Sequence, residues 1–301
     1  MSRKPINQAT SRPSGQEKQI IRFGSDAIEK VLKELGLDSV GAQRVIEHGD
    51  EFARAMREAA TSSLKDLSIT DKYKDEEVKS SYGYFSGYEK PRSITEQCNI
   101  LRQIFPGVGY ADEKLAEGEL PKHAEGWFAI PKWQTIAPTY AEAVQKVLDA
   151  IKKARNGKFY NYREGQIVNE RLRQSNKTEA MFAKLGDEQK DHDILVVPAQ
   201  FGIRHRGRSV RSAREVMNAN ECGLGAFAIG IMILTHPERL SHYDDLWIDC
   251  AGDEFNHPDS DVRLDLAPCF GFDEGEVEFF TGYVGITSDS YGSASGCGPQ
   301  S

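Results

Sequence analysis

The stretch CGLGAFAIGIMIL, residues 222–234, decides the fold, because it is the longest apolar run in the chain. A helix that is apolar on every side has no face to turn to water, so we expect this stretch to lie in the middle of a core. A membrane-spanning helix needs about 20 apolar residues, and this run has only 13. We therefore expect no segment to span a bilayer.

Around this stretch, short apolar segments bounded by charged residues, Gly or Pro predict the strands of a sheet. The segment ILVV at 194–197 is apolar throughout, as in a strand that is buried on both faces. Two later segments are joined by Asp273, Glu274 and Gly275, which predicts a hairpin with the glycine in the left-handed conformation. The expected strands cover residues 127–133, 194–197, 246–250, 269–272 and 276–283.

Two capping boxes predict the helices that pack against these strands. Thr139 and Glu142 form the first, and apolar residues recur at helical spacing from 144 to 151. Ser212 and Glu215 form the second, ahead of the central apolar stretch. Helices and strands alternate without a regular rhythm, so the expected fold class is α+β, a mixed sheet with a buried central apolar helix.

The chain is expected to divide into three regions. Residues 1–19 are polar, contain Pro and Ser and lack an apolar centre, which predicts a disordered tail and no secretory signal. Residues 20–79 carry two amphipathic patterns, typical of a small N-terminal helical appendage, and residues 80–301 form the α+β core domain. The five cysteines lack CxxC spacing, so neither a disulfide framework nor a zinc site is indicated, and a cytoplasmic protein is expected.

Charge is distributed unevenly along the chain. The net charge is −8, made of −2 over residues 1–145, +8 over residues 146–214 and −14 over residues 215–301. A basic middle third points to an anionic partner. The overall acidity opposes non-specific binding to a polyanion, because long-range repulsion acts on the whole molecule.

The basic third ends in RHRGRSVRSAR, which places five arginines within 11 residues. Backbone N–H groups at the start of the following helix would add positive potential, so this segment is a candidate site for phosphate, nucleic acid or a carboxylate. The alternative is that the arginines pair with the acidic C-terminal third. The candidate ligand-binding residues are Arg204, Arg206, Arg208, Arg211 and Arg214.

A second basic segment, KKARNGKFYNYR at 152–163, interleaves cations with Phe159, Tyr160 and Tyr162. Single-stranded nucleic acid is bound by such a pattern, since bases stack on the rings while phosphates meet the charges. The alternative is the end of a helix, whose cations suit the helix dipole, followed by a strand whose rings belong to the core.

Acidic residues after the predicted strand at 246–250 are candidates for chemistry. Asp249, Asp253 and His257 could converge on a divalent metal, and His205 is a further catalytic candidate. The alternative is that Asp249 pairs with an arginine while the others lie in a solvated loop. The segment Asp-His-Asp at 191–193 offers a histidine between carboxylates, but a loop between a helix and a strand commonly collects such residues.

Several long segments carry a resemblance, namely WFAIPKWQTIAPTYAEAV, YNYREGQ, DILVVPAQFG, RHRGRSVR and GAFAIGIMILTHPERL. The chain resembles an uncharacterised family of proteins found in bacterial genome sequences. The resemblance covers roughly residue 93 to the C-terminal GSASG and implies that residues 93–301 form one unit. It implies no activity, cofactor or site residue.

Three hypotheses about function follow from these patterns. The first is a non-enzymatic protein whose arginine segment binds nucleic acid or a phosphate-bearing ligand. The second is a metal-assisted hydrolase or phosphoryl-transfer enzyme, with Asp249 and Asp253 on the metal and His205 or Arg208 holding the substrate. The third is a scaffold subunit of a larger assembly. The sequence leaves open whether the protein is an enzyme, which cofactor it uses and how many copies associate.

Overall fold

The computed structural model describes residues 14–67, 72–256 and 264–298. The chain divides into two compact units, Met1–Leu64 with Ser301, and Lys65–Gln300. The fold is α+β, as the sequence predicts. Within the described residues, no helix combines the length and the apolar character needed to cross a membrane.

The first unit is helical and consists of α1 (Ser14–Leu35), α2 (Ser39–Glu47) and α3 (Gly49–Leu67), except that residues 65–67 of α3 are counted with the second unit. The Asp38 carboxylate caps α2 by accepting the N–H of Gly41 at 2.7 Å. This unit is the expected helical appendage. It begins earlier than predicted, because α1 includes residues 14–19 of the expected tail, while residues 1–13 lie outside the described residues.

A four-stranded antiparallel sheet lies at the centre of the second unit. Its order is β1 (Gly126–Pro131), β4 (Ile194–Gln200), β11 (Ser295–Cys297) and β5 (Glu221–Gly223). Every residue of β4 is buried. The predicted central strand is therefore confirmed.

A second, seven-stranded sheet packs beside the first. The path β10-β6-β8-β7-β3 is joined at β8 by β9, which in turn pairs with β2. The β10–β6 and β2–β9 pairs are parallel and the others antiparallel, so the sheet is mixed. Its strands are β2 (Phe159–Asn161), β3 (Leu172–Gln174), β6 (Trp247–Asp249), β7 (Asp253–Phe255), β8 (Leu266–Asp273), β9 (Glu276–Tyr283) and β10 (Tyr291–Ser293).

The predicted hairpin is the β8–β9 pair. Both Glu274 and Gly275 have positive φ, 47° and 86°. The tight turn therefore uses the left-handed conformation that the sequence predicts.

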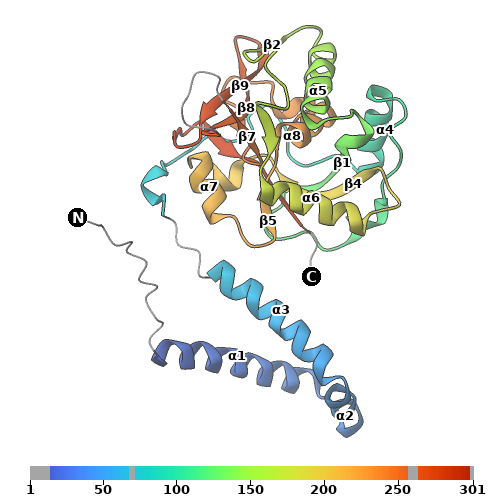
Figure 1. Ribbon diagram of the computed structural model, residues 1–301, viewed down its shortest axis with the longest axis vertical. Coiled ribbons are helices and arrows are strands. Elements are labelled where there is room, and N and C mark those ends of the chain that lie inside the picture. Colours follow the sequence, from blue (N-terminus) through green and yellow to red (C-terminus); the bar gives the residue numbers. More distant parts are fainter. Residues whose placement is uncertain (1–13, 68–71, 257–263, 299–301) are drawn as a thin grey trace, which may run out of the picture. The chain divides into compact units, whose positions relative to one another are not determined.

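Helix α8 (Ala226–Thr235) is buried at every residue, as expected for a stretch with no polar face. It packs against α5 (Tyr140–Ala154) and β1, and its Gly230 lies close to Phe270 of β8. Figure 1 shows this helix within the body of the core, surrounded by the strands and α5. The remaining helices are α4 (Ile94–Ile104), α6 (Asn176–Glu188) and α7 (Val210–Val216), with short 3₁₀ turns η1 (Lys74–Glu76), η2 (Glu113–Glu117), η3 (Trp133–Thr135), η4 (Ile203–His205) and η5 (Pro237–Arg239).

Two boundaries differ from the prediction. The units divide at Leu64, not after residue 79, because Val78 donates its N–H to the Gly207 carbonyl at 2.8 Å and joins residues 72–79 to the core. The capping box predicted at Ser212 is wrong. Helix α7 begins three residues earlier, where the hydroxyl of Ser209 accepts the Ser212 N–H.

Candidate functional site

The arginine segment begins where β4 ends. Gly202 turns the chain with φ of 130°, and a Cβ added there would lie 2.6 Å from the Gly292 carbonyl oxygen, so only glycine fits this turn. The chain then forms η4 and α7. Arg204 lies in η4 and Arg211 and Arg214 lie in α7, whereas Arg206 and Arg208 lie between these elements in isolated β-bridges, so the five arginines do not share one strand face.

The buried carboxylate of Glu221 binds the first part of this segment. It accepts hydrogen bonds from His205 Nε2 at 2.9 Å and Ser295 Oγ at 2.7 Å, and it pairs with Arg204 at 3.1 Å. Burial alone raises the pKa of Glu221, but these partners outweigh it, so the pKa lies below its ordinary value. The cluster joins η4 to β5 and β11.

The outer arginines pair with the acidic segment at 76–77. Arg208 pairs with Glu77 at 2.6 Å, and Arg211 Nε donates to both Glu76 carboxylate oxygens, at 2.8 and 2.9 Å. Ser209 also donates its hydroxyl hydrogen to Glu76. The acidic segment is thus held on the start of α7.

The last two arginines bind backbone carbonyls. Arg206 donates to Tyr82 at 2.7 Å, and Arg214 donates to Ala251 at 2.8 Å and Asp253 at 2.6 Å. Each of the five candidate arginines therefore has a carboxylate or a backbone carbonyl as a partner. The alternative was that these arginines pair with carboxylates of the acidic C-terminal third. Of the three paired carboxylates, only Glu221 belongs to that third, whereas Glu76 and Glu77 come from the N-terminal half.

The two described acidic candidates, Asp249 and Asp253, are both buried. Asp253 is fully buried, and its carboxylate accepts hydrogen bonds from the Tyr140 hydroxyl at 2.8 Å and the Ala226 N–H at 2.7 Å, which caps α8. Burial raises the pKa of Asp249 and of Asp253 to about 7 each. No cluster of three or more His, Cys, Asp or Glu suited to a metal occurs in the described part of the chain, and His257 lies outside it.

A row of aromatic side chains crosses the seven-stranded sheet from β2 to β10. The ring centroids of Tyr160 and Tyr162 are 4.5 Å apart, and Tyr162 lies 6.4 Å from Phe280. Phe280 lies 5.4 Å from Trp247, and Trp247 lies 5.2 Å from Tyr291. Tyr160 and Tyr162 are 50% and 53% exposed, and the other three are half-buried. We call these five residues the aromatic row.

The sheet geometry explains why the row faces outward. Phe159 alternates with Tyr160 along β2 and is buried, so the expectation that the rings of this segment belong to the core holds for Phe159 alone. A Cβ added at Gly271 would lie 2.6 Å from the Trp247 indole, so the glycine lets this ring lie close against the sheet. Alternation along β2 was the available signal, but the partners on β6, β9 and β10 could not be inferred without the strand order.

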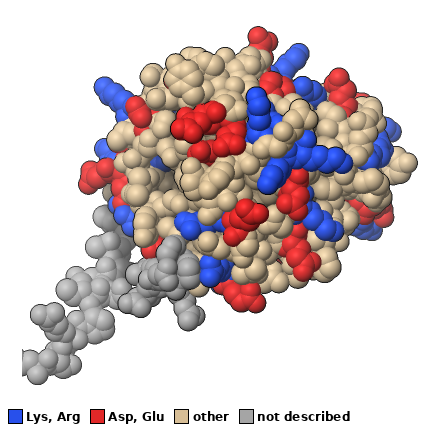
Figure 2. Space-filling view, turned by 90° about the horizontal axis from the view of Figure 1, so that it is seen from above, with Lys and Arg blue, Asp and Glu red and all other residues tan. Residues whose placement is uncertain are grey.

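Charges of both signs border the aromatic row. Lys152 and Lys153 are exposed in the last turn of α5, and Lys158 is exposed directly before β2. On the other side the β8–β9 hairpin is acidic, and Glu278 accepts a hydrogen bond from the Tyr162 hydroxyl at 3.2 Å. The face drawn in Figure 2 carries a compact acidic group beside a stripe of basic side chains.

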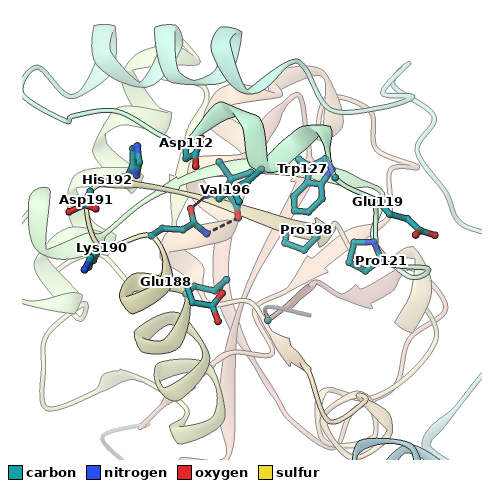
Figure 3. A pocket seen from close by; sticks show the side chains of 15 residues that line it. Asp112, Glu119, Pro121, Trp127, Glu188, Lys190, Asp191, His192, Val196 and Pro198 are labelled. Atoms are coloured by element: carbon teal, nitrogen blue, oxygen red, sulfur yellow. Dashed lines mark hydrogen bonds between the residues drawn. The ribbon is translucent and has the colours of Figure 1, made fainter. Parts of the chain in front are cut away.

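The Asp-His-Asp segment lies partly at a cavity. A cavity of about 550 Å³ is lined by Asp191 and His192, together with Trp127 and Pro198 of the small sheet. Figure 3 shows Asp191 and His192 on one side of this cavity and Trp127 with Pro198 on the other. Asp193 does not line it and lies against Gly109 instead.

Comparison of the chain with protein-family models, curated proteins and solved structures finds no match.

Proposed function

We propose that this protein binds single-stranded nucleic acid through the aromatic row. The observation that carries the proposal is the unbroken contact of five rings across β2, β9, β6 and β10. Exposed rings on a sheet form a stacking surface for unpaired bases, and each stacked base contributes about 1–3 kcal/mol. Bases in a duplex hide their faces from such a surface, so the single strand is the preferred ligand.

The bordering charges orient the strand. Lys158 directly precedes β2 and Tyr162 directly follows it. Residues two apart share a face of an extended chain, so Lys158 is expected on the same side as Tyr160. Phosphates are therefore expected to lie toward Lys152, Lys153 and Lys158, away from the carboxylates of the hairpin. Because few cations take part and the net charge is −8, the affinity should fall with added salt but less steeply than for a protein with many phosphate contacts.

In this proposal the arginine segment has a structural role. Its guanidiniums hold Glu76, Glu77 and Glu221, so replacing them would disturb the fold and not only the ligand. Within the described part of the chain, Lys152, Lys153 and Lys158 do not hold a carboxylate in this way. They are the cations to vary in an experiment.

The test is fluorescence anisotropy with labelled single-stranded DNA, single-stranded RNA and duplex DNA across a salt series. Tyr160→Ala combined with Tyr162→Ala should weaken single-strand binding by about tenfold or more, and Lys158→Ala should lower the salt slope. Tyr243→Ala is the matched control, because Tyr243 is 66% exposed and lies outside the row. It should bind as the unchanged protein does.

Three results would contradict the proposal. They are duplex binding as tight as single-strand binding, an equal loss in the Tyr243→Ala control, and no saturable binding at low salt. Saturable binding of a soluble oligosaccharide that depends on Tyr160 and Tyr162, without nucleic-acid binding, would assign the aromatic row to sugar rings instead.

A further inference from the structure

The cavity beside β4 has an apolar floor. Trp127 of β1 pairs in register with Pro198 of β4, and Val196 lies two residues away on the same face. Leu185 from α6 closes the base and is itself buried. The volume of about 550 Å³ lies within the usual range for small-molecule sites.

The backbone of this floor is already hydrogen-bonded. The Gln189 side-chain amide accepts the Val196 N–H at 2.8 Å and donates to the Val196 carbonyl at 3.2 Å. Pro198 has no N–H to offer. The part of a ligand that lies on this floor should therefore be apolar, because it can bury contact area against β4 but finds no free backbone hydrogen-bonding group at Val196 or Pro198.

The rim of the cavity is acidic. The residues that line the cavity include four carboxylates and only one ammonium, that of Lys190. The carboxylates are those of Asp112, Glu119, Glu188 and Asp191. No ion pair joins any of the four to another of the described residues within 4.0 Å. An anionic guest would meet repulsion at this rim, whereas a cation would be attracted.

Trp127 links the two features. Its side chain is half-buried and lines the cavity. An indole face attracts a cation, most strongly where water is partly excluded. The apolar floor, the indole and the carboxylate rim together favour a ligand that carries a positively charged group on an apolar group.

We infer that this cavity is a binding site for a small organic cation, an ammonium group attached to an aromatic or branched aliphatic body. The site does not depend on the aromatic row and takes a ligand of opposite charge. Trp127 holds the apolar body and the cationic head, and the carboxylates of Glu188 and Asp191 neutralise that head from the end of α6.

The experiment uses isothermal titration calorimetry on the full chain with three probes of similar size. Benzyltrimethylammonium should bind saturably, while benzyl alcohol and benzoate should bind at least about tenfold more weakly. Equal binding of benzoate would overturn the inference, because it would show that the rim does not select charge. Absence of saturable binding of benzyltrimethylammonium at millimolar concentrations would overturn it as well.

Two variants locate the site. Glu188→Gln with Asp191→Asn should weaken benzyltrimethylammonium by about tenfold, and Trp127→Leu should weaken it while keeping an apolar floor. The matched control is Glu164→Gln with Glu170→Gln, which removes two exposed carboxylates away from the cavity and should change nothing. An equal loss in that control would assign the effect to net charge and reject the site. Unchanged thermal melting of the rim variant keeps the comparison valid, since its residues are exposed.

Discussion

At the scale of single residues, Asp245 shows how one carboxylate can hold two loops together. It is fully buried, and Oδ1 accepts the N–H groups of Phe85 and Ser86 at 2.8 and 3.0 Å. Oδ2 accepts those of Ser241 and His242 at 2.9 Å each. The segment at 80–92, which has little regular structure, is thereby joined to the turn that follows η5.

The first prediction concerns this carboxylate. Asp245→Asn should lower the free energy of unfolding by about 3 kcal/mol, because an amide nitrogen cannot accept and leaves two buried N–H groups unpaired. Chemical denaturation at neutral pH measures the loss. Asp244→Asn is the control, since its side chain is 41% exposed, and should cost less than about 0.5 kcal/mol. Equal stability of the two variants would contradict the assigned role.

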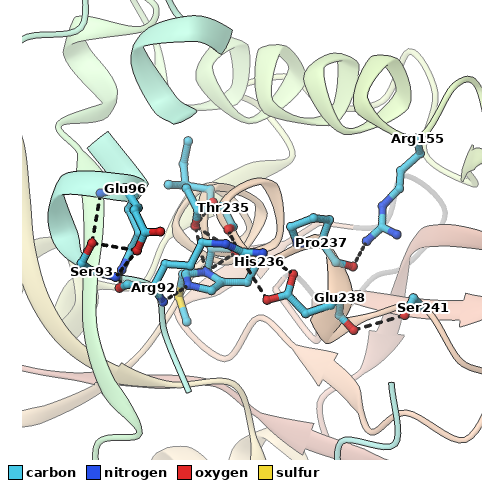
Figure 4. A network of polar contacts seen from close by, with 12 residues as sticks. Arg92, Ser93, Glu96, Arg155, Thr235, His236, Pro237, Glu238 and Ser241 are labelled. Atoms are coloured by element: carbon cyan, nitrogen blue, oxygen red, sulfur yellow. Dashed lines mark hydrogen bonds and ion pairs between the residues drawn. The ribbon is translucent and has the colours of Figure 1, made fainter. Parts of the chain in front are cut away.

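His236 is the second residue whose chemistry is decided by its surroundings. Figure 4 shows it beside Arg92 at the end of α8. Its Nε2 accepts the Arg92 N–H at 2.9 Å, and its Nδ1 lies 3.1 Å from the Met232 carbonyl oxygen. Burial lowers the pKa of His236 to about 4, despite the hydrogen bond to Met232 and the charge of nearby Glu238.

The second prediction follows from this pKa. The unfolded histidine takes up a proton near pH 6.5 and the folded one only near pH 4, so the unfolded state binds more protons between these values. The contribution of His236 to stability should therefore fall by about 3 kcal/mol as the pH drops from 6.5 to 4. The raised pKa values of Asp249 and Asp253 act in the opposite direction over a similar range.

The comparison with His236→Gln isolates the histidine contribution, because glutamine can accept the Arg92 N–H but cannot take up a proton. Unfolding free energies of both proteins are measured from pH 4 to 7, and their difference should shift in favour of the variant as the pH falls, because only the unchanged protein loses the His236 contribution. Parallel curves for the two proteins would show that His236 does not titrate within this window.

At the scale of elements, helices α5 and α8 pack directly against each other in the core. Gly230 makes this contact close, because a Cβ added there would lie 2.4 Å from Val147 Cγ1. Val147 is fully buried and cannot move aside freely. Small size, and not backbone conformation, is what this glycine contributes.

The third prediction compares two helical glycines. Gly230→Ala should lower stability by about 2 kcal/mol, because overpacking outweighs the gain in helix propensity. Gly186→Ala on α6 should instead be neutral or stabilise by up to about 1 kcal/mol, since the nearest side-chain atom lies 3.7 Å away. Thermal melting of both variants measures these two changes in stability. A stabilised Gly230→Ala would mean that α5 and α8 are less tightly packed than described.

At the scale of the whole molecule, the second unit contains its own core. The main cluster of buried apolar side chains contains only residues from Tyr88 onward. The helices of the first unit instead leave apolar side chains exposed, Phe23 at 62% and Ile46 at 70%. The two units should therefore differ greatly in stability.

The fourth prediction is that removing residues 1–64 leaves the melting temperature of the core within about 3 °C. Removing residues 1–79 should lower it further, because Arg208 and Arg211 lose Glu77 and Glu76. Differential scanning calorimetry of both truncations measures this. An equal effect of the two would show that residues 72–79 do not stabilise the core.

The sequence by itself determined the elements whose signals are local. The apolar stretch at 222–234, the buried strand at 194–197, the hairpin turn at 273–275 and the helix N-cap at Thr139 follow from periodicity, burial and turn chemistry over a few residues. The same signals placed the helix start at Ser212 wrongly. Two serines three residues apart offer similar caps, and only the contact with Glu76 favours Ser209.

Only the tertiary structure decided which distant residues meet. The five arginines carry the same charge whether they face water or Glu76, Glu77 and Glu221, and no local pattern distinguishes the two. The aromatic row and the cavity beside β4 likewise depend on strand order and register, which bring residues such as Tyr162 and Phe280 together across more than a hundred positions. Chain topology sets these contacts, because side chains interact through space and not along the sequence.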